Sequence, residues 1–155
     1  MIRRIKLSDK LALEEMLNNI SSFTDKEVEV AMELINVALS FKDQNDYNIF
    51  VYSDNEKVLG YHCTGIRALT DAVYDLYWIV VDSKHQGKGI GKKLLKHAEE
   101  FVKQNNGRWL LIETSSKDDY KNTRNFYLKN NYKIVSQIDD FYKLNDSLVV
   151  YGKRF

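Results

Sequence analysis

The sequence predicts a mixed α/β fold built around one central sheet. The order of the predicted elements is strand, two helices, several strands, then helix, strand, helix and closing strands. The strongest single signal is the run Tyr74–Val81, rich in β-branched and aromatic residues and followed by a turn with three glycines and a helix. With 155 residues, 44% of them hydrophobic, the chain can bury one core of ordinary size. We therefore expect six or seven strands flanked by about four helices.

The first part of the chain predicts one strand and two helices. Residues 2–7 are predicted as a strand, and Ser8 can cap the helix that follows. That helix has an apolar face with i, i+3, i+4, i+7 spacing, formed by Leu13, Met16, Leu17 and Ile20. Thr24 and Glu27 form a capping box, and the apolar residues of the second helix run from Val28 to Ala38.

The middle of the chain predicts three strands and a helix. Residues 47–52 and 57–66 are expected to form a strand pair joined by a turn at residues 53–56. The strand Tyr74–Val81 follows. The next helix, which ends at Gly107, carries its apolar residues at helical spacing, namely Leu94, Leu95, Ala98, Phe101 and Val102.

The last third predicts a strand, a helix and two closing strands. Residues 108–114 are expected to form a buried strand. Ser116 and Asp119 can cap the next helix, which should run to about Asn130. The closing strands are predicted at residues 132–135 and 148–151, with a turn at Asn145-Asp146.

Composition points to a single domain, residues 1–155, in a reducing compartment. The one cysteine, Cys63, cannot form an internal disulfide. The basic N-terminus has no apolar stretch behind it that would suit a signal peptide, and no run has transmembrane length. We therefore expect a cytoplasmic protein that does not associate with membranes.

The turn Gln86–Gly91 is the candidate ligand-binding element. It joins a strand to a helix N-terminus, where backbone N–H groups converge on an anion and glycine lets a ligand come close. Residues 83–98 contain five lysines and no acidic residue, whereas the whole chain carries a net charge of only +1. This local excess of positive charge favours a small phosphate-bearing ligand over a long polyanion, so no nucleic-acid partner is expected.

Two common nucleotide-binding loops do not fit this turn. A P-loop needs four residues between its first glycine and the Gly-Lys pair, followed by Ser or Thr, but only three residues separate Gly87 from Gly91, and Lys93 stands where the hydroxyl is required. The dinucleotide pattern G-x-G-x-x-G would put its third glycine at Lys92. The acid that ends the next strand, Glu113, makes this second pattern the better alternative, but we set it aside.

A third pattern, [Gln/Arg]-x-x-Gly-x-[Gly/Ala], is matched by Gln86, Gly89 and Gly91. Together with the strand ending Trp-Ile-Val-Val-Asp and the later segment Asn122–Tyr132, it resembles the GNAT superfamily of acetyl-CoA-dependent N-acetyltransferases. The resemblance covers roughly residues 73–132. It departs from the family at Asn131, where glycine is usual, but asparagine tolerates the left-handed conformation of a helix terminus.

The resemblance implies a mostly antiparallel sheet and direct transfer of an acetyl group from acetyl-CoA to an amine in a ternary complex, with no metal. The turn would hold the pyrophosphate, the preceding strand would contact the pantetheine arm, and the later helix would add hydrogen bonds. The implied cofactor-binding residues are Ile79, Val80, Val81, Gln86, Gly87, Lys88, Gly89, Ile90, Gly91, Lys92, Asn122 and Asn125.

Three residues are candidates for proton transfer. Tyr127 matches the tyrosine that in this family commonly protonates the coenzyme A sulfur. Asp75 occupies the position of the strand acid in members that use one as a base, and Tyr77 lies on the same face of that strand. Glu113 is a lesser candidate for the base.

The main alternative is a non-catalytic acyl-CoA-binding or partner-binding domain on the same fold, which would lack the proton-transfer groups. His62 and Cys63 should point to opposite faces of a strand and so cannot form a metal pair, while His85 and His97 are expected at the surface. The acceptor is expected to be a small-molecule or peptide amine. The tyrosine-rich closing strands could pair two copies into a homodimer.

Overall fold

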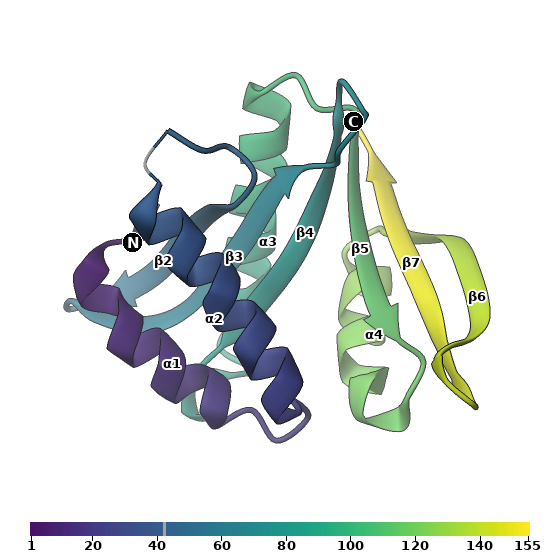
Figure 1. Ribbon diagram of the computed structural model, residues 1–155, viewed down its shortest axis with the longest axis horizontal. Coiled ribbons are helices and arrows are strands. Elements are labelled where there is room, and N and C mark those ends of the chain that lie inside the picture. Colours follow the sequence, from purple (N-terminus) through teal and green to yellow (C-terminus); the bar gives the residue numbers. More distant parts are fainter. Residues whose placement is uncertain (42) are drawn as a thin grey trace.

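The structure, a computed structural model, describes residues 1–41 and 43–155. Its seven strands form one sheet in the order β1-β2-β3-β4-β5-β7-β6, which confirms the predicted mixed α/β fold (Figure 1). The strands are β1 (Ile2–Arg4), β2 (Asn48–Asp54), β3 (Lys57–Ile66), β4 (Val73–Val81), β5 (Trp109–Ser115), β6 (Lys133–Lys143) and β7 (Asp146–Arg154). The α-helices are α1 (Lys10–Asn18), α2 (Asp25–Ser40), α3 (Ile90–Gln104) and α4 (Lys121–Lys129). None of the described helices is long and apolar enough to cross a membrane.

Helices cover both faces of the sheet, and each face has its own core. Helices α1 and α2 pack over β2 and β3, while α3 and α4 lie on the opposite face, where α4 is adjacent to β5 (Figure 1). The first core contains Leu13 and Leu17 of α1 together with Ile35 of α2, and the second contains Leu95 of α3 and Tyr127 of α4. Burial of these apolar side chains is the main source of stability in both layers.

Strands β4 and β5 form the one parallel pair among the strands of the described residues, and they stay paired for only three residues. Val73–Asp75 pair with Trp109–Leu111, after which the two strands diverge. Each diverging strand follows its other neighbour, because β4 stays paired with β3 up to Val81 and β5 stays paired with β7 along its whole length. A β-bulge in β4, which leaves Tyr77 without a partner between Leu76 and Trp78, adds a local bend. The inner edges of β4 and β5 are thus open beyond the shared end.

The N-terminal predictions are partly confirmed. Thr24 and Glu27 form the predicted capping box, in which the Thr24 N–H donates to Glu27 Oε2 at 2.7 Å. The predicted cap at Ser8 is wrong, because Ser8 lies inside a 3-10 turn, Leu7–Asp9. The Asp9 carboxylate organises this corner instead, accepting from the Lys6 N–H at 2.8 Å and from the Arg3 guanidinium at 2.7 and 2.8 Å.

Two predictions near the C-terminus are also wrong. Helix α4 has no side-chain cap, and the Ser116 hydroxyl accepts instead from the N–H of Ser147 at 2.7 Å. The closing strands are longer than predicted. The extent of β6 was underestimated because this strand is exposed along its whole length, so no alternation of buried and exposed residues marks where it begins and ends. Asn131 does adopt the expected left-handed conformation, with φ = 66°.

His97, which was expected at the surface, is half-buried and paired with a buried histidine. His62 Nε2 lies 2.9 Å from His97 Nδ1, and His62 Nδ1 lies 2.9 Å from Thr64 Oγ1. Burial, followed by the proximity of His97, lowers the pKa of His62 to about 3, and burial also lowers the pKa of His97. Both rings are therefore neutral at pH 7 and link β3 to α3 by a hydrogen bond between imidazoles. His85 is also half-buried and contacts Asp82.

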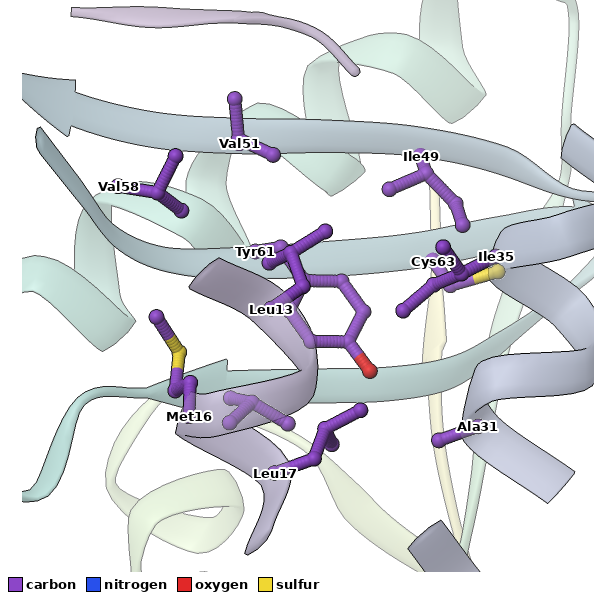
Figure 2. Packing of buried hydrophobic residues seen from close by; sticks show 11 residues of the cluster. Leu13, Met16, Leu17, Ala31, Ile35, Ile49, Val51, Val58, Tyr61 and Cys63 are labelled. Atoms are coloured by element: carbon purple, nitrogen blue, oxygen red, sulfur yellow. The ribbon is translucent and has the colours of Figure 1, made fainter. Parts of the chain in front are cut away.

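Tyr61 is a polar residue placed deep in the first core. Figure 2 shows its ring surrounded by apolar side chains, among them Leu13, Leu17 and Ile35. The side chain is fully buried, and its hydroxyl has no hydrogen-bond partner among the described residues. A buried hydroxyl in this state has lost its hydration without compensation.

We therefore expect Tyr61→Phe to raise the free energy of unfolding by about 1 kcal/mol, since it removes an unsatisfied donor and leaves the packed ring in place. Urea denaturation measures this directly. The matched control is Tyr132→Phe, which removes a hydroxyl that donates to Glu99 Oε1 at 3.1 Å and should lower stability. Equal or reduced stability of the Tyr61 variant would contradict the prediction.

Candidate active site

The glycine turn is shaped to leave backbone N–H groups pointing outward. Gly87 and Gly89 have φ of +75° and +79°, a conformation that residues other than glycine rarely adopt. Gly89 is the N-cap of α3, and the first helical hydrogen bond runs from Lys93 N–H to Gly89 carbonyl at 3.1 Å. The N–H groups of residues 90–92 consequently have no partner within the helix, which makes this end of α3 suited to an anion.

The side chains around the turn strengthen this positive character. Lys84, Lys88, Lys92 and Lys93 are all exposed, and no salt bridge among the described residues uses any of them. Lys96, one turn further along α3, pairs with Glu100 at 3.6 Å. Positive charge that is not neutralised therefore gathers at the N-terminal end of the helix, next to its positive dipole end.

A cavity runs from the glycine turn toward the centre of the sheet. Its lining consists of the end of β4, the turn and one face of α4, namely Ile79, Val81, Gln86, Gly87, Gly91, Asn122, Thr123, Phe126 and Tyr127. A second, smaller cavity of about 170 Å³ shares five of these residues and also reaches Glu113 and the α1–α2 loop. Because that loop and α4 lie on opposite faces, the second cavity passes through the sheet where β4 and β5 diverge.

Tyr127 lines both cavities from α4. Its side chain is only 3% exposed and is backed by the rings of Phe126, Tyr132 and Tyr151, with centroids 5.4 to 5.9 Å away. Burial raises the pKa of the phenol well above its usual value, so the hydroxyl stays protonated at neutral pH. Arg124 fixes the helix, because its guanidinium donates to the carbonyls of Ser115 and Lys117 at 2.8 and 2.6 Å.

Arg67 joins two carboxylates at the point where the strands diverge. Its Nε donates to both oxygens of Asp75 at 3.0 Å, and its terminal nitrogen lies 2.8 Å from Asp75 Oδ1. The same nitrogen donates to Glu113 Oε1 at 2.9 Å. One guanidinium from the β3–β4 loop thus ties β4 to β5 where their pairing ends.

The two candidate bases differ in how much of each carboxylate is available. Both oxygens of Asp75 are engaged by Arg67, and the side chain is only 12% exposed. Burial raises the pKa of Asp75, an effect that Arg67 only partly offsets. Glu113 is 47% exposed, and no hydrogen bond among the described residues uses its Oε2. Glu113 also lines three neighbouring cavities, one of which is the 170 Å³ cavity that Tyr127 lines as well.

The structure brings most of the predicted cofactor-binding residues together around the first two cavities. Lys88 and Gly89 lie on the exposed turn beside them, and Lys92 is exposed in the first turn of α3. The Ile90 side chain, by contrast, is buried in a small core with Leu59 and Leu94 and can contribute only its backbone. Asn125 is exposed and is not part of the lining of either cavity. In residues 1–41 and 43–155, no three His, Cys, Asp or Glu side chains form a group suited to a metal.

Sequence reasoning assigned no role in the site to Arg67, Thr123 or Tyr120, and it predicted for Glu27 only a place in the capping box. Thr123 lies inside the recognised α4 segment, so its position was available as a signal. Arg67, Tyr120 and Glu27 reach the site through contacts between residues far apart in the chain, and no local pattern marks them. Their roles depend on the packing of β4, β5 and α2 around one cleft.

Comparison with known proteins agrees with this geometry. Residues 45–134 match the sequence profile described as an acetyltransferase (GNAT) domain. A solved structure of an acetyltransferase assigned to the GNAT family from Desulfovibrio desulfuricans is 30% identical, with a TM-score of 0.95, and the match covers 99% of this chain and 98% of that chain. A search of curated protein sequences gave no match.

More distant structures share the fold. The ribosomal-protein-S18-alanine N-acetyltransferase from Escherichia coli has a TM-score of 0.79 at 15% identity, with 99% of this chain and 92% of that chain covered. An aminoglycoside 6'-N-acetyltransferase complexed with coenzyme A has a TM-score of 0.76 at 17% identity, with 99% and 96% covered. At these identities the similarity describes the fold alone.

The turn geometry predicts that Gly89→Ala lowers the free energy of unfolding by about 1 kcal/mol, since alanine is strained at positive φ. Gly91→Ala is the matched control, because a Cβ at Gly91 would meet Phe126 at an ordinary contact distance of 3.6 Å. Urea denaturation of both variants tests this. Equal stability of Gly89→Ala and Gly91→Ala would contradict the strain argument.

Proposed function

Because this chain belongs to the GNAT acetyltransferase family, we propose that it transfers an acetyl group from acetyl-CoA to a primary amine within a ternary complex. The observation that carries the proposal is the continuous cleft between β4 and β5. An anion site opens into one end of it, and a carboxylate available to accept a proton lies toward the other. Such a cleft lets two substrates meet at its centre from opposite faces of the sheet.

On the donor side, the fit to acetyl-CoA rests on the outward N–H groups of residues 90–92 and the surrounding lysines, which suit a pyrophosphate. The open inner edge of β4 offers backbone groups to the amide-containing arm, and Asn122 and Thr123 add polar groups from α4. When bound, acetyl-CoA supplies a thioester carbonyl that an amine can attack. Its sulfur would then lie near Tyr127.

On the acceptor side, we assign the base to Glu113 in preference to Asp75, which the sequence analysis ranked first. An ammonium must lose a proton before its nitrogen can attack. Glu113 has an oxygen available, whereas Asp75 is held on both oxygens by Arg67. Asp75 and Arg67 would then fix the position of Glu113 at the end of the cleft.

The chain's own residues account for both proton movements. Glu113 takes one proton from the ammonium, which frees the lone pair of the nitrogen to attack the thioester carbon and form the C–N bond, and Tyr127 gives its proton to the sulfur as the C–S bond breaks. The buried phenol is suited to this role because it remains protonated until the thiolate develops beside it. The nitrogen of the new amide loses its second proton, which restores the phenol of Tyr127 through solvent, and Glu113 releases its own proton to solvent, so each turnover releases one proton.

The proposal is tested by calorimetric titration with acetyl-CoA, using NAD and ATP as controls, followed by an amine panel in which the released thiol is detected. We expect selective micromolar binding of acetyl-CoA and turnover with at least one amine. Binding without turnover on any amine would favour a non-catalytic acyl-CoA-binding domain. Failure to bind acetyl-CoA would overturn the proposal.

The proton-transfer assignment predicts that Tyr127→Phe and Glu113→Gln each lower kcat by about a hundredfold. The Kd for acetyl-CoA should stay unchanged, since neither change touches the anion site. Tyr132→Phe is the control for the tyrosine, because it lies in the same aromatic cluster outside the cavity linings and should keep its kcat. Wild-type kcat in Tyr127→Phe would show that the sulfur finds its proton elsewhere.

A further inference from the structure

We infer that the acceptor is a small molecule with two cationic groups, a diamine in its simplest form, whose reacting ammonium faces Glu113 and whose second cation lies at Glu27. This inference rests on the proposed function and names the substrate class of the same cleft. It follows from the cavity beyond Glu113, from the state of the Glu27 carboxylate and from the balance of charge between them.

The cavity beyond Glu113 is placed to receive an acceptor. It has a volume of about 320 Å³, at the small end of the range for sites of small ligands. Tyr77 and Glu113 line both this cavity and the 170 Å³ cavity that passes through the sheet beside Tyr127. A molecule bound here would therefore have one end beside the reacting groups and the other end toward α2 and Tyr120.

Glu27 presents a fixed negative charge at that far end. Its Oε2 accepts from Thr24 N–H at 2.7 Å, and its Oε1 accepts from the Tyr120 hydroxyl at 2.5 Å. Burial acts to raise its pKa, but the hydrogen bonds from Tyr120 and Thr24 outweigh burial and keep the pKa below its usual value. No lysine or arginine among the described residues forms a salt bridge with it.

The other charges of the cavity do not cancel this one. Lys117 pairs with Asp146 at 3.6 Å and also attracts Glu27, so its one positive charge is shared between two carboxylates, and the Ser115 hydroxyl donates to Asp146. Glu113 shares Arg67 with Asp75, so those three groups together keep one negative charge. The cavity thus retains two separate negative centres, at Glu113 and at Glu27, which suit two cations better than one.

The walls between the two centres favour cations and disfavour carboxylates. They include four aromatic side chains, Tyr77, Trp78, Tyr120 and Tyr142, and aromatic faces attract ammonium groups. The two cationic side chains at the site are already engaged, Lys117 of the lining with Asp146 and the neighbouring Arg67 with two carboxylates, so neither has much left to offer a further carboxylate. An amine that carries a carboxylate at its far end would instead meet Glu27.

The test compares three series of amines matched in chain length: α,ω-diamines from propane to hexane, n-alkylamines and ω-amino acids. We expect kcat/KM for the best diamine to exceed that of the alkylamine of equal length by roughly tenfold or more, because its second ammonium gains a charge-assisted contact. A tenfold ratio corresponds to about 1.4 kcal/mol. The amino acid should be the poorest of the three, and added salt should reduce the preference.

The variant that isolates the second cation site is Glu27→Gln, since glutamine preserves the capping box. It should lower kcat/KM for the diamine by a larger factor than that for the alkylamine, and so bring the two values close together. Glu33→Gln, on the exposed face of the same helix, is the control and should keep the preference.

Equal kcat/KM for diamine and alkylamine in the wild type, or a preference that survives in Glu27→Gln, would overturn the inference. So would turnover confined to other acceptors, such as peptide N-termini, or no turnover with the three series in a protein that binds acetyl-CoA. Those last two outcomes leave the proposed function standing. Absence of acetyl-CoA binding would overturn both the proposed function and the inference about the acceptor.

Discussion

The site depends on the early end of pairing between β4 and β5. If the two strands stayed paired along their length, the backbone groups of Leu76 to Val81 would be used within the sheet and no passage would connect its two faces. Pairing with β3 and with β7 draws the strands in different directions, and the bulge at Tyr77 bends β4 further. The cleft is therefore a consequence of sheet topology and does not require a flexible loop.

Stabilising such an opening requires a strong contact at its closed end. Arg67 supplies it, because a single guanidinium bonds to Asp75 of β4 and to Glu113 of β5. Two carboxylates brought this close would repel each other without that cation. At the open end, the Tyr120–Glu27 hydrogen bond connects α2 to the turn before α4.

Sequence alone predicts the parts of this arrangement that are local. The glycine turn and Tyr127 are readable because the spacing of Gln86, Gly89 and Gly91, and the residues around Tyr127, lie within single short segments. The long-range parts are not readable in this way. Arg67 follows a strand without any motif, and Glu27 reads only as half of a capping box. The same limit explains why the caps predicted at Ser8 and Ser116 are wrong. Near Ser8 the Asp9 carboxylate is the stronger acceptor, and the Ser116 hydroxyl accepts from the distant residue Ser147.

Although the net charge of the chain is close to zero, its charged side chains are distributed unevenly between the two mouths of the cleft. The lysines of residues 84–93 lie on or next to the glycine turn at one mouth of the cleft, whereas three carboxylates, Glu27, Glu113 and Asp146, and a single lysine, Lys117, lie toward the other. Because the sheet separates these mouths, the two fields act on different approaching molecules instead of cancelling within one surface. In the reaction proposed above, an anionic donor and a cationic acceptor would be drawn to opposite faces and would meet at the gap between β4 and β5. The charge at each mouth would then favour a different substrate without any conformational change.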